Sequence, residues 1–189
     1  MRGFDAAYSF GAYDGALREL IHIFKYGKVR SLAWPLGELL ARALARDERY
    51  DLVTAVPLHW RRRWQRGFNQ AELLARQIER RTGVPFGRTL RRVRSTPAQA
   101  GLSNTARRRN VRSAFARRRR GPDLSGRRVL LIDDVMTTGS TAAACARVLK
   151  DAGAARVALL TVARVDRRMD FTPGAAARKQ SVSIEREAS

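Results

Sequence analysis

Two adjacent carboxylates stand directly before a turn of small and hydroxylated residues. Asp133 and Asp134 follow the apolar run 129–132, and residues 136–141 (Met-Thr-Thr-Gly-Ser-Thr) lead into a helix-forming run that ends at Ala152. A helix N-terminus offers unpaired N–H groups and a partial positive charge, so such a turn can hold a phosphate. Carboxylates repel a phosphate, so the two acids should face hydroxyl groups or a metal. A sugar phosphate meets both demands, with its diol against the acids and its phosphate in the turn.

Other strand-turn-helix motifs fit this stretch less well. No lysine follows the glycine, as a P-loop requires, and there is one glycine where a dinucleotide fingerprint has three. A phosphoacceptor domain also places acids at the end of a strand, but it does not need the Thr-Thr-Gly-Ser-Thr turn. The plainest alternative is an ordinary junction of strand and helix with good capping residues.

Apolar periodicity predicts the elements that position the motif. The runs 129–132 and 157–163 lack polar alternation, which is typical of strands buried on both faces, and 51–56 is a third short strand. Helical periodicity marks the stretches 14–24, 36–43, 71–78 and 141–152. This alternation predicts an α/β fold with a mostly parallel sheet flanked by helices. Ligands of such sheets bind at the carboxyl ends of strands, where Asp133, Asp134 and residues 57–61 lie.

Positive charge is concentrated in the middle of the chain. The net charge is +21, and residues 61–128 hold 21 arginines, no lysine and three acids, hence a net charge of +18. Such a field favours a nucleic acid, a pyrophosphate or an acidic protein as partner, and the alternative is a solvated surface rich in arginine. Arginine and tryptophan interleave after Pro57, which suits either nucleic acid or a loop that closes over a pyrophosphate. The candidate nucleic-acid contacts in this stretch are Arg61, Arg62, Arg63 and Arg66.

Length and composition limit the class of protein. The 189 residues suffice for one domain, and neither an apolar run of 18 residues nor an N-terminal signal pattern is present. We therefore expect a soluble, cytoplasmic protein without membrane insertion. The single cysteine, Cys145, excludes an intramolecular disulfide and a cysteine-cluster metal site, and its place on an apolar helix face predicts burial. Residues 94–112 lack hydrophobic periodicity, which indicates a long mobile loop.

The stretch 129–141 resembles the phosphoribosyl pyrophosphate (PRPP) motif of the type I phosphoribosyltransferases. This resemblance implies that Asp133 and Asp134 hold the 2- and 3-hydroxyls of ribose. The residues implied to cradle the 5-phosphate are Met136, Thr137, Thr138, Gly139, Ser140 and Thr141.

A wider resemblance covers residues 8–164. In chain order, the matching segments are 13–26, 56–59, 66–70 (Arg-Gly-Phe-Asn-Gln), 96–99, 107–115 and the PRPP motif. Together they are similar to the ComF/GntX family, phosphoribosyltransferase-like proteins linked to DNA uptake in competent bacteria. The expected organisation is one domain of type I phosphoribosyltransferase-like fold over residues 1–165 and a disordered tail over 166–189. Members of this family commonly begin with a zinc ribbon, but this sequence has no cysteine pair, so zinc is not expected.

The resemblance implies a glycosyltransferase reaction in which an acceptor displaces pyrophosphate from the anomeric carbon of PRPP. Mg²⁺ accompanying PRPP and preorganised cations would stabilise the leaving pyrophosphate, and Asp133 or Asp134 would steady the positive charge on the ribose. The main chain of a loop beginning at Leu58 is expected to bind the pyrophosphate. Its residues and their candidate helpers are Leu58, His59, Trp60, Arg61 and Lys25.

Three functions are compatible with these observations. The first is Mg²⁺-dependent phosphoribosyl transfer to an unknown acceptor. The second is a non-catalytic competence protein whose basic face binds single-stranded DNA or the DNA-uptake machinery. The third is a regulator that binds PRPP without turnover. The sequence leaves the acceptor and a homodimeric state open.

Overall fold

The computed structural model describes residues 3–44, 48–58, 67–93 and 114–165. The predicted loop 94–112 and the predicted tail 166–189 lie outside these residues, so both stay predictions.

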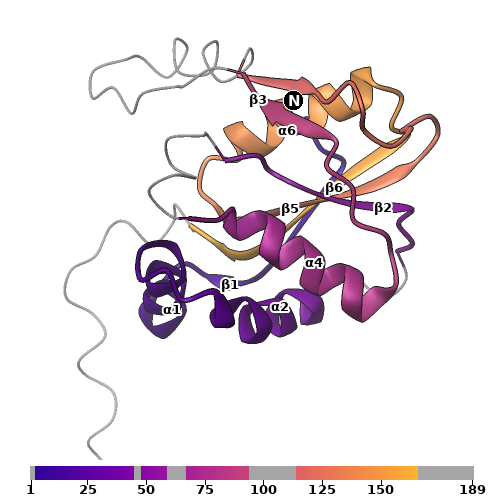
Figure 1. The fold of residues 1–189 in the computed structure, drawn as a ribbon. Helices are drawn as coiled ribbons and strands as arrows, with labels where there is room; N and C mark the ends of the chain where they lie inside the picture. The colour runs from indigo at the N-terminus through magenta and orange to yellow at the C-terminus, as the bar shows by residue number, and fades with distance from the viewer. Residues whose placement is uncertain (1–2, 45–47, 59–66, 94–113, 166–189) are drawn as a thin grey trace, which may run out of the picture.

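A four-stranded parallel sheet forms the centre of the described structure (Figure 1). Its order is β1 (Ala6–Ala12), β6 (Arg156–Arg164), β5 (Arg128–Met136) and β2 (Leu52–Ala55). All three neighbouring pairs are parallel. The two long central strands correspond to the two apolar runs without polar alternation, as expected for strands that other elements cover on both faces.

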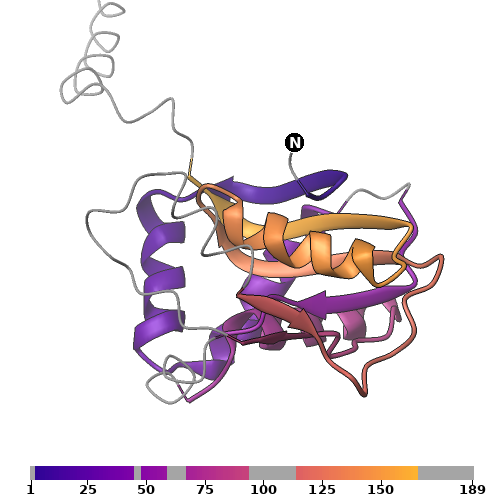
Figure 2. The same ribbon diagram turned by 90° about the horizontal axis from the view of Figure 1, so that it is seen from above.

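Helices cover both faces of the sheet. The helices α1 (Gly15–Tyr26), α2 (Ala33–Arg42) and α4 (Gln70–Thr82), with the short 3₁₀ helix η1 (Arg30–Leu32), contribute to the core on one face. The other face carries α6 (Ser140–Asp151) and an antiparallel pair of short strands, β3 (Leu90–Arg92) and β4 (Phe115–Arg117). Figure 1 shows α1, α2 and α4 below the sheet, and Figure 2, seen from above, shows α6 lying across it.

The central strand β5 supplies alternate residues to two separate cores. Leu130 and Ile132 pack with the α1, α2 and α4 side, whereas Val129 and Leu131 pack with the α6 side, around Cys145. All five side chains are at most 1% exposed, and burying each stabilises the fold by roughly 1–3 kcal/mol. The predicted burial of Cys145 is therefore confirmed, and burial raises the pKa of its thiol.

The strand β5 is longer than the apolar run 129–132 indicates. It continues through both acids to Met136, because β6 pairs with it as far as Met136, opposite Arg164. On its other side, β2 ends with Ala55 opposite Ile132. Residues 133–136 of β5 therefore extend past β2 at the carboxyl edge of the sheet.

Candidate functional site

The turn between β5 and α6 leaves the positive end of a helix uncovered by acidic side chains. Gly139 is the N-cap of α6 and has φ +71°, a left-handed conformation that favours glycine. The Thr138 hydroxyl accepts the Ser140 N–H at 3.2 Å and donates to Ser140 Oγ at 2.9 Å. The first turn of α6 contains no acidic residue, and its N-cap has no side chain to compensate the helix dipole. This arrangement suits an anion.

A small cavity of about 50 Å³ lies at this turn. Asp133 of β5 and Thr161 of β6 line it together with the whole turn 136–141. A cavity needs roughly 10–15 Å³ to hold a single water, so this one has room for a phosphate-sized group. The structure thus brings Asp133 and all six predicted phosphate-turn residues to one cavity.

Asp133 is set up to exchange a proton near neutral pH. Burial raises the pKa of this carboxyl to about 7, and the neighbouring negative charge of Asp134 adds to the rise. Two weaker effects oppose it: the Asp134 N–H donates to Asp133 Oδ1 at 2.9 Å, and the Lys25 ammonium is nearby. Asp133 can therefore accept or donate a hydrogen bond at physiological pH, depending on its protonation.

Asp134 is directed away from this cavity. Successive side chains of a strand point to opposite faces of the sheet, and Asp134 Oδ1 lies 3.0 Å from Lys25 Nζ of α1. Both side chains are mostly buried, at 14% and 16% exposure. Reasoning from the sequence treated Lys25 as a helper of the pyrophosphate loop and missed this ion pair. The alternation of adjacent strand residues was the available signal that the two acids separate.

The end of α1 and the following η1 contact the described part of the Arg-Gly-Phe-Asn-Gln segment. The rings of Phe24 and Phe68 lie 5.6 Å apart. Arg30 donates to the Gly67 carbonyl at 3.0 Å, and its guanidinium lies 5.3 Å from the centre of the Phe68 ring. This segment leads into α4, so the end of α1, η1 and the beginning of α4 meet at one place.

Most of the predicted pyrophosphate loop and all four candidate nucleic-acid contacts lie outside the described residues. These are His59, Trp60, Arg61, Arg62, Arg63 and Arg66. Leu58 is described and does not line the cavity at the phosphate turn. It borders a second, larger cavity of about 190 Å³ at the carboxyl end of β2.

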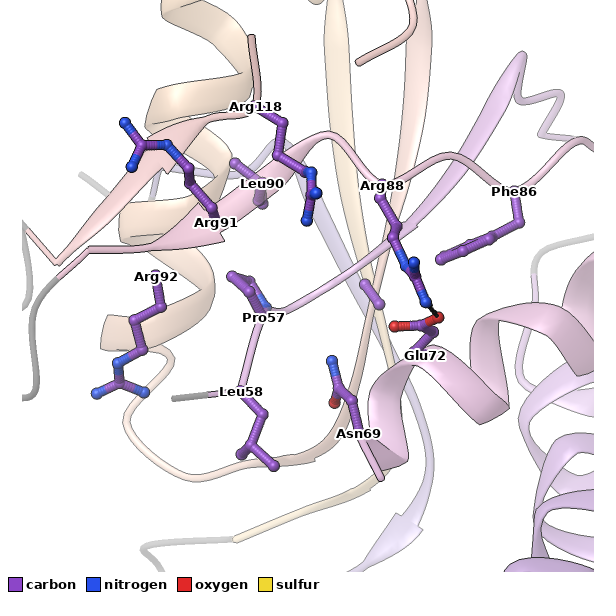
Figure 3. Close-up of a pocket in the computed structure, with 11 residues that line it drawn as sticks. Pro57, Leu58, Asn69, Glu72, Phe86, Arg88, Leu90, Arg91, Arg92 and Arg118 are labelled. Atoms are coloured by element: carbon purple, nitrogen blue, oxygen red, sulfur yellow. Dashed lines mark hydrogen bonds and ion pairs between the residues drawn. The ribbon is translucent and has the colours of Figure 1, made fainter. Parts of the chain in front are cut away.

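Arginine dominates this second cavity, which we call the arginine cavity. Its basic lining residues are Arg88, Arg91, Arg92 and Arg118, and its acidic one is Glu72 (Figure 3). Sequence reasoning recognised the charge of residues 61–128 but not this cluster. The cluster forms only because β3 and β4 pair and lie beside the end of β2.

The described part of the chain has neither a cluster of metal-ligating side chains nor a helix suited to cross a membrane. No group of three or more histidine, cysteine or acidic residues there could hold a metal ion. None of the helices in the described ranges is both long and apolar enough to cross a membrane.

Comparison with protein families identifies the class of protein. The family of the phosphoribosyl transferase domain matches residues 65–174, more than half of the chain. The chain therefore belongs to the phosphoribosyl transferase domain family. This match and the parallel sheet flanked by helices confirm the predicted fold class.

Individual relatives make the assignment narrower. The chain is 36% identical over 159 residues to the DNA utilization protein YhgH of Escherichia coli K12, covering 80% of this chain and 69% of that protein. It is 34% identical over 161 residues to competence protein F of Haemophilus influenzae, covering 82% and 70%. These relatives confirm the predicted ComF-type resemblance. Among solved structures, glutamine PRPP amidotransferase of B. subtilis is 26% identical, with a TM-score of 0.48, over 69% of this chain and 26% of that one.

Proposed function

We propose that this protein binds PRPP together with Mg²⁺ and transfers its phosphoribosyl group to an acceptor, releasing pyrophosphate. The observation that carries the proposal is the shared cavity of Asp133 and the turn 136–141 at the N-terminus of α6. The Asp133 carboxylate, which can accept hydrogen bonds from ribose hydroxyls, lies there beside a turn that can hold a phosphate. The chain belongs to the phosphoribosyl transferase domain family.

Each part of the cavity has a separate task under this proposal. The N–H groups and hydroxyls of the turn bind the 5-phosphate, and the Asp133 carboxylate accepts a hydrogen bond from a ribose hydroxyl. Lys25 offsets the charge of Asp134, which reduces the repulsion that an incoming polyphosphate meets.

The carboxylate at the cavity also fits the proposed metal. Mg²⁺ usually keeps several waters and binds through one or two carboxylates plus the phosphates of a substrate. Asp133 would supply one such carboxylate at the cavity, with the remaining oxygens coming from PRPP and water. When bound, Mg²⁺ would offset charge on the leaving pyrophosphate. The bond from the anomeric carbon to pyrophosphate breaks, a bond to the acceptor forms, and Asp133 steadies the positive charge of the ribose.

Calorimetric titration with PRPP, with and without Mg²⁺, tests the proposal. We expect saturable, Mg²⁺-dependent binding that weakens at least about tenfold in Asp133→Asn, because a charged hydrogen bond contributes roughly 1.5–3 kcal/mol. Asp151→Asn is the matched control, since Asp151 is an exposed carboxylate at the far end of α6. No binding by the wild-type protein, or equal weakening in both variants, would contradict the proposal. Release of pyrophosphate in an acceptor screen then separates transfer from PRPP sensing without turnover.

A second candidate function is a DNA-handling role of the basic surface. It is supported by the net charge of +18 over residues 61–128 and by the names of the relatives, DNA utilization protein and competence protein F. Single-stranded DNA binding that persists in Asp133→Asn would support it, because Asp133 does not line the arginine cavity. Absence of DNA binding at low salt would contradict it.

A further inference from the structure

The arginine cavity lies at the carboxyl end of β2 and is built by elements from three parts of the chain. Pro57 and Leu58 line it together with the beginning of α4, the strand β3 and Arg118, the residue directly after β4. In Figure 3 the side chain of Arg118 extends in the direction of Pro57, whereas that of Arg88 extends to Glu72 at the beginning of α4.

The positive charges of this cavity exceed the negative charge that could neutralise them. Glu72 is paired with Arg88, whose Nε donates to it at 3.0 Å. Arg91 and Arg118 are exposed and have no ion-pair partner among the residues that the structure describes. With four arginines and one acid, the lining carries a net charge of +3. Like charges gathered around one concavity repel each other, and a bound anion removes that repulsion.

Packing holds part of this cluster in place before any ligand arrives. The Arg92 guanidinium lies 5.3 Å from the centre of the Phe115 ring on the neighbouring strand, a distance at which cation–π attraction operates. The ion pair to Glu72 likewise holds Arg88. Guanidinium groups that are already oriented lose less side-chain entropy on binding, and their planar forks match phosphate oxygens.

We propose that the arginine cavity is a second phosphate-binding site, separate from the turn that precedes α6. The two cavities share no lining residue, and they lie on different elements. At about 190 Å³ the cavity is smaller than the ~300 Å³ at which sites for whole organic ligands begin. It therefore takes phosphate groups, and the rest of the ligand extends outside. Those groups belong either to a free nucleotide or to single-stranded DNA, and the site stands independently of phosphoribosyl transfer.

A pair of matched double variants tests this site. Arg91→Gln with Arg118→Gln removes two charges from the cavity. Arg119→Gln with Arg120→Gln removes two charges from exposed residues just beyond β4 that do not line it. Binding of a labelled oligothymidylate is measured by anisotropy across a salt series, and binding of ADP and of PRPP with Mg²⁺ by calorimetry.

We expect the cavity variant to lose about tenfold in affinity for ADP or for the oligonucleotide, because each arginine supplies charge-assisted hydrogen bonds to phosphate. If the source is DNA, the slope of log K against log salt becomes shallower by about 1.4, since each contact on a single strand contributes roughly 0.7. Loss for ADP alone assigns the site to a nucleotide. The control variant and PRPP affinity should change less than about twofold.

Three results would overturn the second site. Equal losses in the two double variants would mean that the surface acts only through its overall charge. A parallel loss of PRPP affinity in the cavity variant would make the arginines part of the first site. Unchanged affinity for both ADP and the oligonucleotide would leave the cavity without a ligand. A failure of PRPP to bind the wild-type protein refutes only the proposed phosphoribosyl transfer.

Discussion

The two proposed phosphate sites would hold their ligands in opposite ways. The cavity at the phosphate turn contains no arginine or lysine among its lining residues, and it combines helix N–H groups and hydroxyls with the acid Asp133. The arginine cavity relies on guanidinium charge. Backbone donors fix the position of one phosphate and leave the adjacent acid free to select a ligand with hydroxyl groups. Guanidinium groups attract many polyanions and are more sensitive to salt. We infer that the first cavity is selective and that the second is permissive.

The largest expected difference between the two cavities is the pH dependence of stability that Asp133 gives to the first. The pKa of Asp133 is about 4 in an unfolded chain and about 7 in the folded protein, so between these values the folded protein binds more protons. Its contribution to the free energy of unfolding therefore falls as pH rises from 4 to 7 and is constant above. Relative to wild type, Asp133→Asn should gain roughly 4 kcal/mol of stability between pH 4 and pH 8, because three pKa units correspond to about 1.36 kcal/mol each. Urea unfolding at several pH values measures this, and a difference independent of pH would contradict it.

Removing Lys25 should damage only the first cavity. Lys25→Met leaves Asp134 mostly buried and unpaired, which should cost about 2 kcal/mol of stability, somewhat less than a fully buried pair loses. PRPP affinity should fall as well, because the uncompensated carboxylate repels the ligand, while ADP binding at the arginine cavity stays constant. Urea unfolding and calorimetry measure these effects. The double variant with Asp134→Asn should recover most of the stability, and failure to recover would mean that Lys25 acts through other contacts.

Two glycines allow a comparison of backbone strain inside and outside the site. Gly139 and Gly126 have φ of +71° and +70°, and neither has an atom within 3.4 Å of where a Cβ would lie. Alanine at either position should cost about 1 kcal/mol of stability. Only Gly139→Ala should also weaken PRPP binding, because it disturbs the N-cap of α6. Equal PRPP affinity in the two variants would show that the turn does not bind the phosphate.

The extent of the fold that could be predicted depended on how local each signal was. The strand, turn and helix of residues 129–152 were predictable because apolar period and turn residues act over short distances. The ends of these elements were less predictable. The strand β5 continues through Asp133 to Met136 because β6 is long enough to pair with it there, and the apolar run 129–132 cannot reveal this.

The part of the candidate site that could be predicted is likewise the part whose residues are contiguous in sequence. Asp133 and the turn 136–141 are contiguous in sequence, and the structure gathers them at one cavity. The Lys25–Asp134 pair joins residues more than a hundred positions apart, and the arginine cavity needs β2, α4, β3 and β4 to meet. Such contacts follow from tertiary packing and have no period or spacing in the sequence.

The overhang of β5 past β2 has a consequence for how the sheet edge behaves. The Val56 N–H donates to the Ile132 carbonyl, the last such bond between β2 and β5. In a parallel strand, alternate residues direct their polar groups to the same neighbour, so the Asp134 N–H faces the side where β2 has ended. The Asp133 carboxylate accepts that N–H. The Asp133 side chain therefore occupies the Asp134 N–H, the donor that another strand would need in order to pair with β5 at this position. The edge of β5 beyond the end of β2 thus stays accessible to a small molecule.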